Sequence, residues 1–444
     1  MFFIPSRALL VIDLLVLFHF AAHWLWRATR TGRPFSYWHI QILMVLVIPL
    51  FLSFPFAGAA LNILAVGSNL DAIQKALPAA FSICVLGYVS LYSMYYLTPI
   101  FLKITGPSFL RKPLAKLTYR FINSELCLRT HWWIAGLSGI ILLGFVWLHY
   151  GVTFNIRQYA LENGSLRPIA GLFYVSYLPL IAQFLFISYL SHRHRRYLTP
   201  FTLLLVVLLP YGARSGLVAI FLVPLIVVLC LRGTFRHLIM SVACLPLIVF
   251  AGIYLSQIRS GIYSPITTVA TFLPNIAYGN TFSDLRDFSW VLGDWDGQYL
   301  HGRSYLAALM GMVPCTVVPF RRENEIGVFT VRTAGLDEES HGGIRPGSFG
   351  EAYFNFGLAG VLGIGMLLGF VFRSIDIHLE IESRRPKPDL IRAFSFTIAA
   401  KLAGNIAITA QFWENYIVIG VLVSGWVIRD LHRLYWKHVR DDGQ

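Results

Sequence analysis

Apolar runs of about twenty residues recur along almost the whole chain, and this pattern limits the possible folds more than any other feature. Crossing roughly 30 Å of hydrocarbon takes about 20 apolar residues in a helix, which satisfies its own backbone hydrogen bonds without water. Charged residues make up 13% of the chain, whereas soluble globular proteins average about 25%. The sequence therefore predicts an all-α, polytopic integral membrane protein.

The apolar runs divide into about eleven predicted transmembrane helices. They cover residues 6–26, 38–58, 79–102, 132–150, 169–190, 200–212, 216–231, 237–256, 352–372, 391–411 and 413–429. The first run is too long for a signal-peptide core and lacks a small-residue cleavage site, so we interpret it as a retained helix. No internal repeat or low-complexity tract divides the chain, which predicts a single membrane domain over residues 1–444.

Basic residues predict the orientation of these helices. They cluster in the connections after the first, third, fifth, seventh and ninth helices and at the C-terminus. Short connections rich in Lys and Arg stay in the cytoplasm, which places the N-terminus outside and the C-terminus inside. This distribution explains the net charge of +14 without nucleic acid as a partner. The five cysteines show no C-x-x-C spacing and are expected to be buried hydrophobes.

Residues 103–131 form the most basic cytoplasmic connection. At helical spacing its apolar residues share one face, and Lys112, Lys116 and Arg120 lie away from them. Such a helix lies along an anionic membrane surface, so membrane lipids are expected partners. A solvated charged loop is the alternative interpretation.

Residues 257–351 form a large predicted outer loop that is more polar than the chain before it. Its apolar stretch SYLAALMGMVPCTVVPF is short and contains Pro314 and Pro319. A full span there would invert every later helix and put the basic C-terminus outside. We therefore predict a re-entrant or interfacial segment, which is tolerated where protein or a watery cavity shelters the backbone.

Arginines on the predicted outer side are the first candidates for chemistry. Arg214 lies in PYGARSG, a polar break between two apolar runs. The outer loop carries Arg259, Arg286, Arg303, Arg321, Arg322, Arg332 and Arg345. A guanidinium forms paired, charge-assisted hydrogen bonds with phosphate, so an anionic ligand would explain these residues. Snorkelling to lipid headgroups, or ion pairs with loop aspartates, would explain them without a ligand.

The stretch ESHGGIRPGSFGEAYFNFG combines the strongest candidates. Glu351 and Asn355 are spaced to share one helix face, and His341 and Arg345 precede them on a glycine-rich approach. A helix N-terminus attracts anions, so these groups could perform an acid–base step on an anionic substrate. Alternatively, Glu351 is a first-turn carboxylate favoured by the helix dipole. The glycines that follow are expected to permit close helix packing; they are Gly357, Gly360, Gly365 and Gly369.

Lys401 lies in the middle of a predicted span. Charges at membrane depth usually have a partner, so it either pairs with Asp13 or Glu414 or lines a cavity and contacts a substrate phosphate. The chain has no G-x-G-x-x-G, Walker, H-E-x-x-H or nucleophile-elbow motif. We therefore expect no cofactor, and no metal, because Asp294 and Asp296 have no further acids nearby.

Three stretches resemble the Wzy-type O-antigen polymerases, a family of oligosaccharide repeat unit polymerases. LLPYGARSGLVAIFL resembles the arginine-bearing helix break of that family. HGRSYLAALMGMVPCTVVPF is similar to its "G-small-Ser-Tyr … Pro … Pro" segment, and RPGSFGEAYFNFGLAGVLGIGMLLG to its "G-E-x-Y-x-N-F-G-x-x-G" helix entrance. The resemblance covers most of the chain and implies the fold of membrane-embedded class C glycosyltransferases.

The resemblance also implies a reaction at the periplasmic face of the bacterial inner membrane. A growing glycan is transferred from undecaprenyl diphosphate to a sugar hydroxyl of another lipid-linked repeat unit, without nucleotide sugar or ATP. The implied diphosphate-binding residues are Arg214, Arg259, Arg303 and Arg345. Glu351 is the preferred base and His341 the second choice; Tyr353, Asn355 and Lys401 would orient the substrate. A chain-length regulator and the repeat-unit flippase are possible partners.

Two other functions stay open from the sequence. An O-antigen ligase would use a lipid A-core acceptor, but the G-E-x-Y-x-N-F-G stretch favours a polymerase. A polysaccharide or lipid transporter would be expected to show repeated halves and broken helices at the midplane, whereas the polarity of this chain collects at one face.

Overall fold

The computed structural model describes residues 6–57, 70–105, 112–150, 176–208, 214–240, 282–313, 315–338, 343–409 and 412–441. The described residues are helical or in turns and contain no strand, which confirms the all-α prediction. In the first half of the chain the elements are α1 (Arg7–Thr31), α2 (Tyr37–Ile42), the π-helical η1 (Leu43–Ala57), α4 (Leu70–Thr105), α5 (Lys112–Ile122), α6 (Glu125–Tyr150), α9 (Leu178–His192) and α10 (Arg195–Leu208). In the second half they are α11 (Arg214–Arg232), α14 (Asp284–Asp294), α15 (Arg303–Leu309), α16 (Pro319–Asn324), α17 (Ile326–Thr333), α18 (Gly347–Ser383), α19 (Leu390–Gly404), the 3-10 turn η4 (Asn405–Ala407) and α20 (Phe412–Asp441).

Within the described ranges, five helices are long and apolar enough to cross a membrane. They are α1, α4, α6, α18, and α19 with its short continuation to Ala407. α1 and α6 turn much of their apolar surface outward: Phe18 is 72% exposed and Leu148 is 86% exposed. Large apolar faces of this kind suit lipid rather than water, so the chain has the character of a helical membrane protein.

The helix ends differ from the predicted boundaries where polar residues begin. α18 starts at Gly347 and runs to Ser383, whereas the apolar run predicted only residues 352–372. The apolar pattern stops there, but Arg, Glu and Leu are good helix formers and the backbone keeps winding. α19 is shorter than the predicted 391–411 helix, because it ends at Gly404 and passes into a 3-10 turn.

α4 and α18 form the tightest helix pair, and glycines make it possible. A Cβ on Gly365 would lie 2.7 Å from the carbonyl oxygen of Gly87, and one on Gly369 would lie 2.5 Å from that of Leu91. The Ser90 hydroxyl also donates a 2.7 Å hydrogen bond to the Leu362 carbonyl oxygen across the interface. The prediction that Gly365 and Gly369 permit close packing is confirmed.

Replacing Gly369 by Ala is expected to destabilise the protein by about 1–3 kcal/mol, because the added methyl group overpacks the interface with α4. Gly363 lies in the same helix, and a Cβ added there would meet nothing within 4 Å. Gly363→Ala should therefore be neutral or slightly stabilising. Thermal unfolding of the purified variants measures both effects; equal melting temperatures would contradict the packing role of Gly369.

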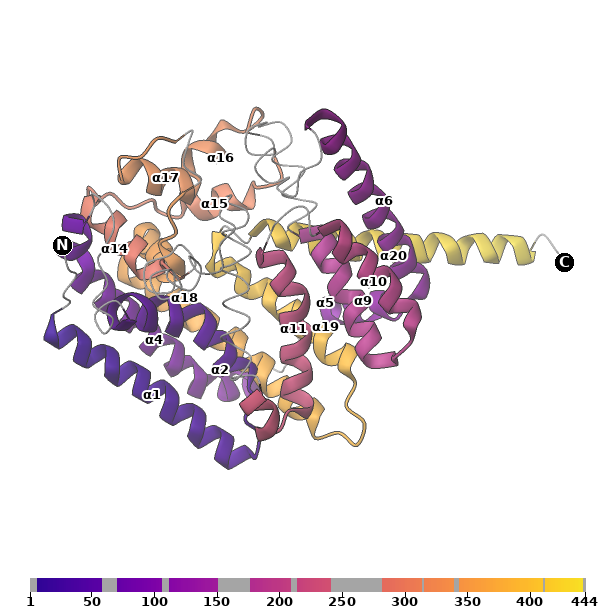
Figure 1. The fold of residues 1–444 in the computed structure, drawn as a ribbon, viewed down its shortest axis with the longest axis horizontal. Helices are drawn as coiled ribbons and strands as arrows, with labels where there is room; N and C mark the ends of the chain where they lie inside the picture. Colours follow the sequence, from indigo (N-terminus) through magenta and orange to yellow (C-terminus); the bar gives the residue numbers. More distant parts are fainter. Residues whose placement is uncertain are drawn as a thin grey trace, which may run out of the picture.

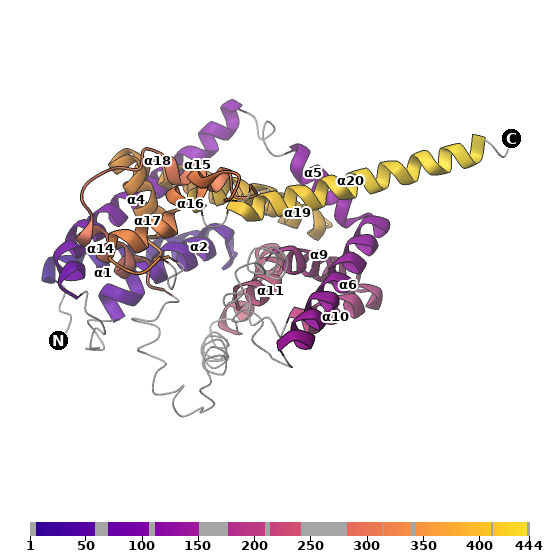
Figure 2. The ribbon, with the colours of Figure 1, turned by 90° about the horizontal axis from the view of Figure 1, so that it is seen from above.

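The short helices α14 to α17 gather around the N-terminal end of α18 (Figure 1; the same grouping is seen from above in Figure 2). They carry the described part of the predicted outer loop. Of the predicted apolar stretch, residues 304–309 lie in α15 and residues 319–320 begin α16, helices of seven and six residues; Pro314 lies outside the described residues. Neither is long enough to cross a bilayer, in agreement with a segment that is not a full span.

The basic connection predicted as an interfacial helix contains α5. Thr118, Phe121 and Ile122 of α5 are buried against α19, α20 and α6, while Lys116 and Arg120 point outward. The amphipathic pattern is therefore satisfied in large part by protein contacts. The placement of α5 on the inner leaflet stays a prediction.

Candidate active site

Glu351 lies at the centre of a buried polar site that joins three segments of the chain. Its side chain is 3% exposed. Oε1 accepts hydrogen bonds from the hydroxyls of Ser304, at 3.2 Å, and of Thr409, and Oε2 accepts one from the Thr409 backbone N–H at 3.2 Å. We refer to Ser304, Glu351, Asn355 and Thr409 as the polar corner.

Asn355, one turn after Glu351, fastens the start of α15 to α18. Its Oδ1 accepts a hydrogen bond from the Gly302 N–H at 3.1 Å. Its Nδ2 donates to the Ser304 hydroxyl at 2.8 Å and to the Glu351 carbonyl oxygen at 2.9 Å. The amide therefore positions the hydroxyl that contacts the Glu351 carboxylate. The predicted shared face of Glu351 and Asn355 is confirmed.

Gly357 interrupts α18 directly after the polar corner. Its φ of 62° and ψ of −149° are non-helical, in a region that only glycine adopts readily. The carbonyls of Phe354 and Asn355 accept hydrogen bonds from the N–H groups of Leu300 and His301, at 2.8 and 3.1 Å. The prediction that Gly357 serves close helix packing is wrong: it forms a kink beside the carbonyls that hold the loop before α15.

The break between α19 and α20 supplies the third side of the polar corner. Asn405 Nδ2 donates to Asn415 Oδ1 at 2.9 Å, and Asn415 Nδ2 donates to the Leu402 carbonyl oxygen at 3.1 Å. These contacts tie the two helices together around Thr409. The interpretation of Glu351 as a first-turn carboxylate is wrong, because α18 begins at Gly347 and has no acidic residue in its first turn; Glu351 instead contacts Ser304 and Thr409.

Lys401 has a partner within the protein. Its Nζ lies 3.4 Å from Glu414 Oε2, and the two side chains are 37% and 30% exposed. Of the two partners that the sequence offered, Lys401 pairs with Glu414. Asp13 is buried, and within the described parts of the chain its carboxylate makes no hydrogen bond. A role for Lys401 in orienting substrate would require the ammonium to leave this pair.

Two of the predicted diphosphate-binding arginines flank the polar corner in sequence. Arg303 immediately precedes Ser304, and Arg345 stands just before α18; both are exposed. Arg214 is the first residue of α11. Arg259 and His341 lie outside the described residues.

Asp284 lies beside the start of α18. Its side chain would contact a Cβ on Gly347 at 3.3 Å. The pKa of Asp284 is raised from 3.8 to about 6, mainly by burial and also by the nearby Asp287 carboxylate, while the Arg345 guanidinium lowers it. Asp284 and Arg345 therefore interact electrostatically next to the start of α18.

Replacing Asp284 by Asn is expected to stabilise the protein at neutral pH. A raised folded-state pKa means that the unfolded chain loses its proton first, so the stability contributed by Asp284 is present below pH 4 and lost as the pH rises to about 6. Asp284→Asn removes this loss of stability, which is about 3 kcal/mol above pH 6 for a pKa raised from 3.8 to about 6 and little near pH 4. Thermal unfolding across this range, with exposed Asp294→Asn as control, measures the gain; a gain independent of pH would contradict the assignment.

Aromatic side chains form one wall next to the polar corner. The ring of Tyr353 meets Trp295 edge-on with centroids 5.7 Å apart, and Tyr299 at 6.2 Å. Tyr299 is 41% exposed. Such rings can stack on the apolar faces of sugars, and this is where the predicted substrate-orienting Tyr353 is placed.

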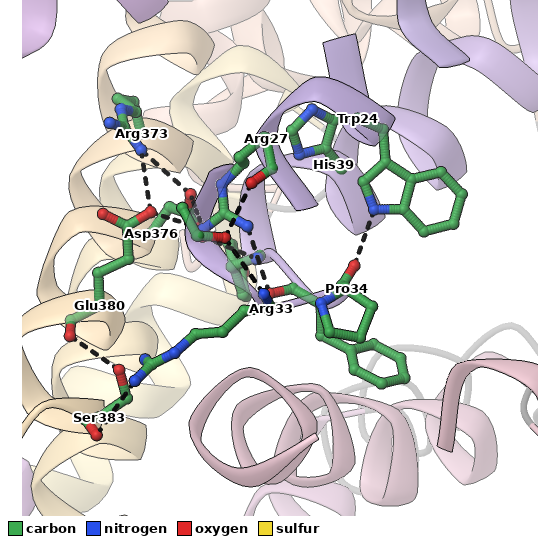
Figure 3. Close-up of polar contacts among 12 residues, drawn as sticks. Trp24, Arg27, Arg33, Pro34, His39, Arg373, Asp376, Glu380 and Ser383 are labelled. Atoms are coloured by element: carbon green, nitrogen blue, oxygen red, sulfur yellow. Dashed lines mark hydrogen bonds and ion pairs between the residues drawn. The ribbon is translucent and has the colours of Figure 1, made fainter. Parts of the chain in front are cut away.

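A second buried polar cluster was not predicted from the sequence. Arg27 of α1 lies 3.0 Å from Asp376 Oδ2 and 2.6 Å from Glu380 Oε1 of α18. Arg373 lies 3.2 Å from Asp376 and 3.6 Å from Glu380. Figure 3 shows the two arginines directed at the two acids from different helices. We refer to these four residues as the ion cluster.

The sequence contains a signal for the ion cluster. Arg373, Asp376 and Glu380 are spaced three and four residues apart, so they share one helix face. In the sequence Arg27 follows the first apolar run, where a basic residue indicates orientation. In the structure Arg27 points inward and pairs with the acidic face of α18. An acidic face on one predicted helix is therefore a signal that a basic residue at the end of another helix can be buried.

Among the residues that the structure describes, no group of three or more His, Cys, Asp or Glu side chains could hold a metal ion. Cys84, Cys127 and Cys230 are buried free thiols and Cys315 is partly exposed. Cys84, Cys127 and Cys230 thus occupy the positions of small apolar residues, as predicted, whereas Cys244 lies outside the described residues. The expected absence of a cofactor stays a prediction.

Comparison with protein-family models, curated proteins and solved structures gives no match to this chain. The site is therefore interpreted from its geometry. The polar corner offers a carboxylate that can accept a proton, two hydroxyls that orient it, and exposed arginines on the adjoining segments. That combination suits transfer of a group away from an anionic leaving group.

Proposed function

We propose that this chain is a membrane glycosyltransferase that polymerises lipid-diphosphate-linked oligosaccharide repeat units, as the resemblance to the Wzy-type O-antigen polymerases implies. The observation that carries the proposal is the placement of the Glu351 carboxylate between Ser304 and Thr409, with Arg303 and Arg345 on the adjoining segments. The proposal includes eleven spans, the bacterial inner membrane, and a site that faces the periplasm.

In the proposed reaction, an acceptor sugar hydroxyl attacks the anomeric carbon of the donor glycan. The bond from that carbon to the diphosphate oxygen breaks, and the electron pair leaves with the diphosphate. Arg303 and Arg345, with Arg214 and Arg259, would stabilise the charge that develops there. Glu351 would take the hydroxyl proton. No metal or nucleotide is needed, because the bond that breaks supplies the free energy.

The contacts of Glu351 suggest how the acceptor hydroxyl would reach it. The Ser304 hydroxyl lies 3.2 Å from Oε1, the longer of the two hydroxyl contacts to that oxygen. Ser304 Oγ also accepts a hydrogen bond from Asn355, so the Ser304 oxygen keeps a donor when its O–H turns away from the carboxylate, and that O–H can donate to the substrate instead. The acceptor hydroxyl would then take its place on the carboxylate, while Thr409 keeps the carboxylate in position.

The test is an assay with purified protein and synthetic undecaprenyl-diphosphate repeat units. The proposal predicts a ladder of products that differ by one repeat unit, and its loss in Arg214→Ala, which removes a predicted diphosphate contact. The exposed Arg195, changed to Ala, is the matched control and should retain the ladder. A folded protein that forms product only when a lipid A-core acceptor is added would be a ligase, and one that forms none would contradict the proposal.

A further inference from the structure

A shallow groove lies where α5 crosses α20, away from the polar corner. Its walls are apolar, formed by Leu117, Phe121, Leu422 and Trp426, and two arginines, Arg120 and Arg429, stand at its edge. None of these residues takes part in the proposed reaction. The groove combines apolar walls with two positive charges contributed by different helices.

The groove exists because α20 carries a glycine at the crossing. A Cβ on Gly425 would lie 2.3 Å from the ring of Phe121. The Cys127 thiol, at the start of α6, donates a 3.1 Å hydrogen bond to the Gly425 carbonyl oxygen. These contacts fix α5 and α20 against each other, so the relative position of Arg120 and Arg429 is set by packed backbone.

Neither Arg120 nor Arg429 is paired with two carboxylates, as the arginines of the ion cluster are. Arg120 is exposed and makes no ion pair with any described residue. The Arg429 side chain is 18% exposed, and its Nε lies 3.5 Å from Oδ1 of its neighbour Asp430. This Nε is buried and makes no hydrogen bond within the described chain, so the Asp430 contact is an ion pair only. A buried guanidinium N–H without an acceptor is costly, and an anionic ligand would supply one.

Beyond the groove, α20 extends away from the other helices toward the C-terminus (Figures 1 and 2). Its apolar residues there are exposed: Leu431 at 61%, Leu434 at 64% and Tyr435 at 62%. Arg433 follows Arg429 at i+4 and shares its face, opposite these apolar residues. An exposed apolar face next to a basic face is the pattern of a helix that contacts anionic lipid.

We propose that the groove between α5 and α20 binds an anionic phospholipid, with its phosphate between Arg120 and Arg429 and an acyl chain along the exposed ring of Trp426. Basic pockets between membrane helices on the cytoplasmic side bind such headgroups. Arg120 lies in the predicted cytoplasmic connection, and Arg429 lies at the predicted cytoplasmic end of the last span. The apolar walls favour a lipid over a soluble phosphate, which would leave them in contact with water. The inference does not depend on the proposed function.

Trp426 provides the test, because it lines the groove and its fluorescence is quenched by brominated acyl chains in contact with it. The full-length protein is reconstituted into phosphatidylcholine vesicles that contain brominated phosphatidylglycerol or, at equal mole fraction, brominated phosphatidylcholine. The component lost in Trp426→Phe should be quenched more by the anionic lipid. The affinity of the groove for phosphatidylglycerol relative to phosphatidylcholine should fall about tenfold in Arg120→Gln and in Arg429→Gln, since each substitution removes one charge-assisted contact.

Arg195→Gln removes an exposed arginine elsewhere on the chain and should leave the preference unchanged. Equal quenching by the two lipids in the wild-type protein would overturn the proposal, and this measurement needs no arginine variant to fold. A preference that survives both arginine substitutions would overturn it as well. So would displacement of the brominated phosphatidylglycerol by inorganic phosphate but not by chloride of equal ionic strength, which would indicate a site for a soluble anion.

Discussion

Glu351→Gln is expected to reduce chain extension at least about 100-fold, because a general base contributes roughly 10²–10⁴ to a rate and an amide cannot take the proton. The change also alters the polar corner, where Thr409 donates both its hydroxyl and its backbone N–H to the carboxylate. Gln offers one oxygen in place of two, so one donor loses its acceptor, at about 1–3 kcal/mol. Chain extension by the purified variant and its melting temperature measure the two effects separately.

A second variant separates the chemical role of Glu351 from a purely structural one. Thr409→Val removes the hydroxyl contact but leaves the carboxylate and the backbone N–H in place. If Glu351 is the base, Thr409→Val should extend chains far better than Glu351→Gln at a similar loss of stability. Equal activity of the two variants would show that the polar corner only holds α15, α18 and the α19–α20 break together. Glu338→Gln, an exposed change in the same outer loop, is the control.

Arg27→Ala is expected to destabilise the protein more than Gly369→Ala or Glu351→Gln. Arg27 is 3% exposed and contacts both Asp376 and Glu380. Removing one partner of a buried ion pair costs about 3–5 kcal/mol, because the remaining charges stay buried without compensation. Thermal unfolding, followed with a thiol-reactive dye at the buried Cys84, Cys127 and Cys230, should show a melting temperature lower by about 3–5 °C.

Arg30 provides the control for this prediction. It lies one turn further along α1 and is exposed, and its guanidinium carbon lies 5.4 Å from the centroid of the Trp26 ring. Arg30→Ala should therefore change the melting temperature little. Equal decreases in Arg27→Ala and Arg30→Ala would show that the ion cluster does not stabilise the contact between α1 and α18. Asp376 lies about 38 Å along α18 from Glu351 at 1.5 Å per residue, so Arg27→Ala should retain chain extension at a temperature where it is folded.

Much of the fold could be predicted from the order of apolar and polar residues. Lipid imposes helices and a minimum length, so α1, α4, α6 and α18 correspond to predicted spans. The packing role of Gly365 and Gly369 could also be predicted, because a small residue on an apolar helix face has few other uses. The helix ends were harder to predict, since hydropathy does not indicate where the polar end of a helix stops.

The candidate site was predictable only in part. Glu351, Asn355 and Arg345 stood out as polar residues at the start of an apolar helix, and the structure places Glu351 and Asn355 together. Ser304 and Thr409 carried no such signal, because serine and threonine are common in loops and helix ends. They lie 47 and 58 residues from Glu351 along the chain, and only folding brings them to it.

The sequence by itself determined a helical chain suited to a membrane, and the polar start of α18 as the place to look for chemistry. Both follow from local composition, since transfer into lipid acts on each segment in turn. The tertiary structure decided the partners: Thr409 for Glu351, Glu414 for Lys401, and Asp376 with Glu380 for Arg27. Buried polar groups must find hydrogen bonds or counter-charges, and which group supplies them depends on how the helices pack.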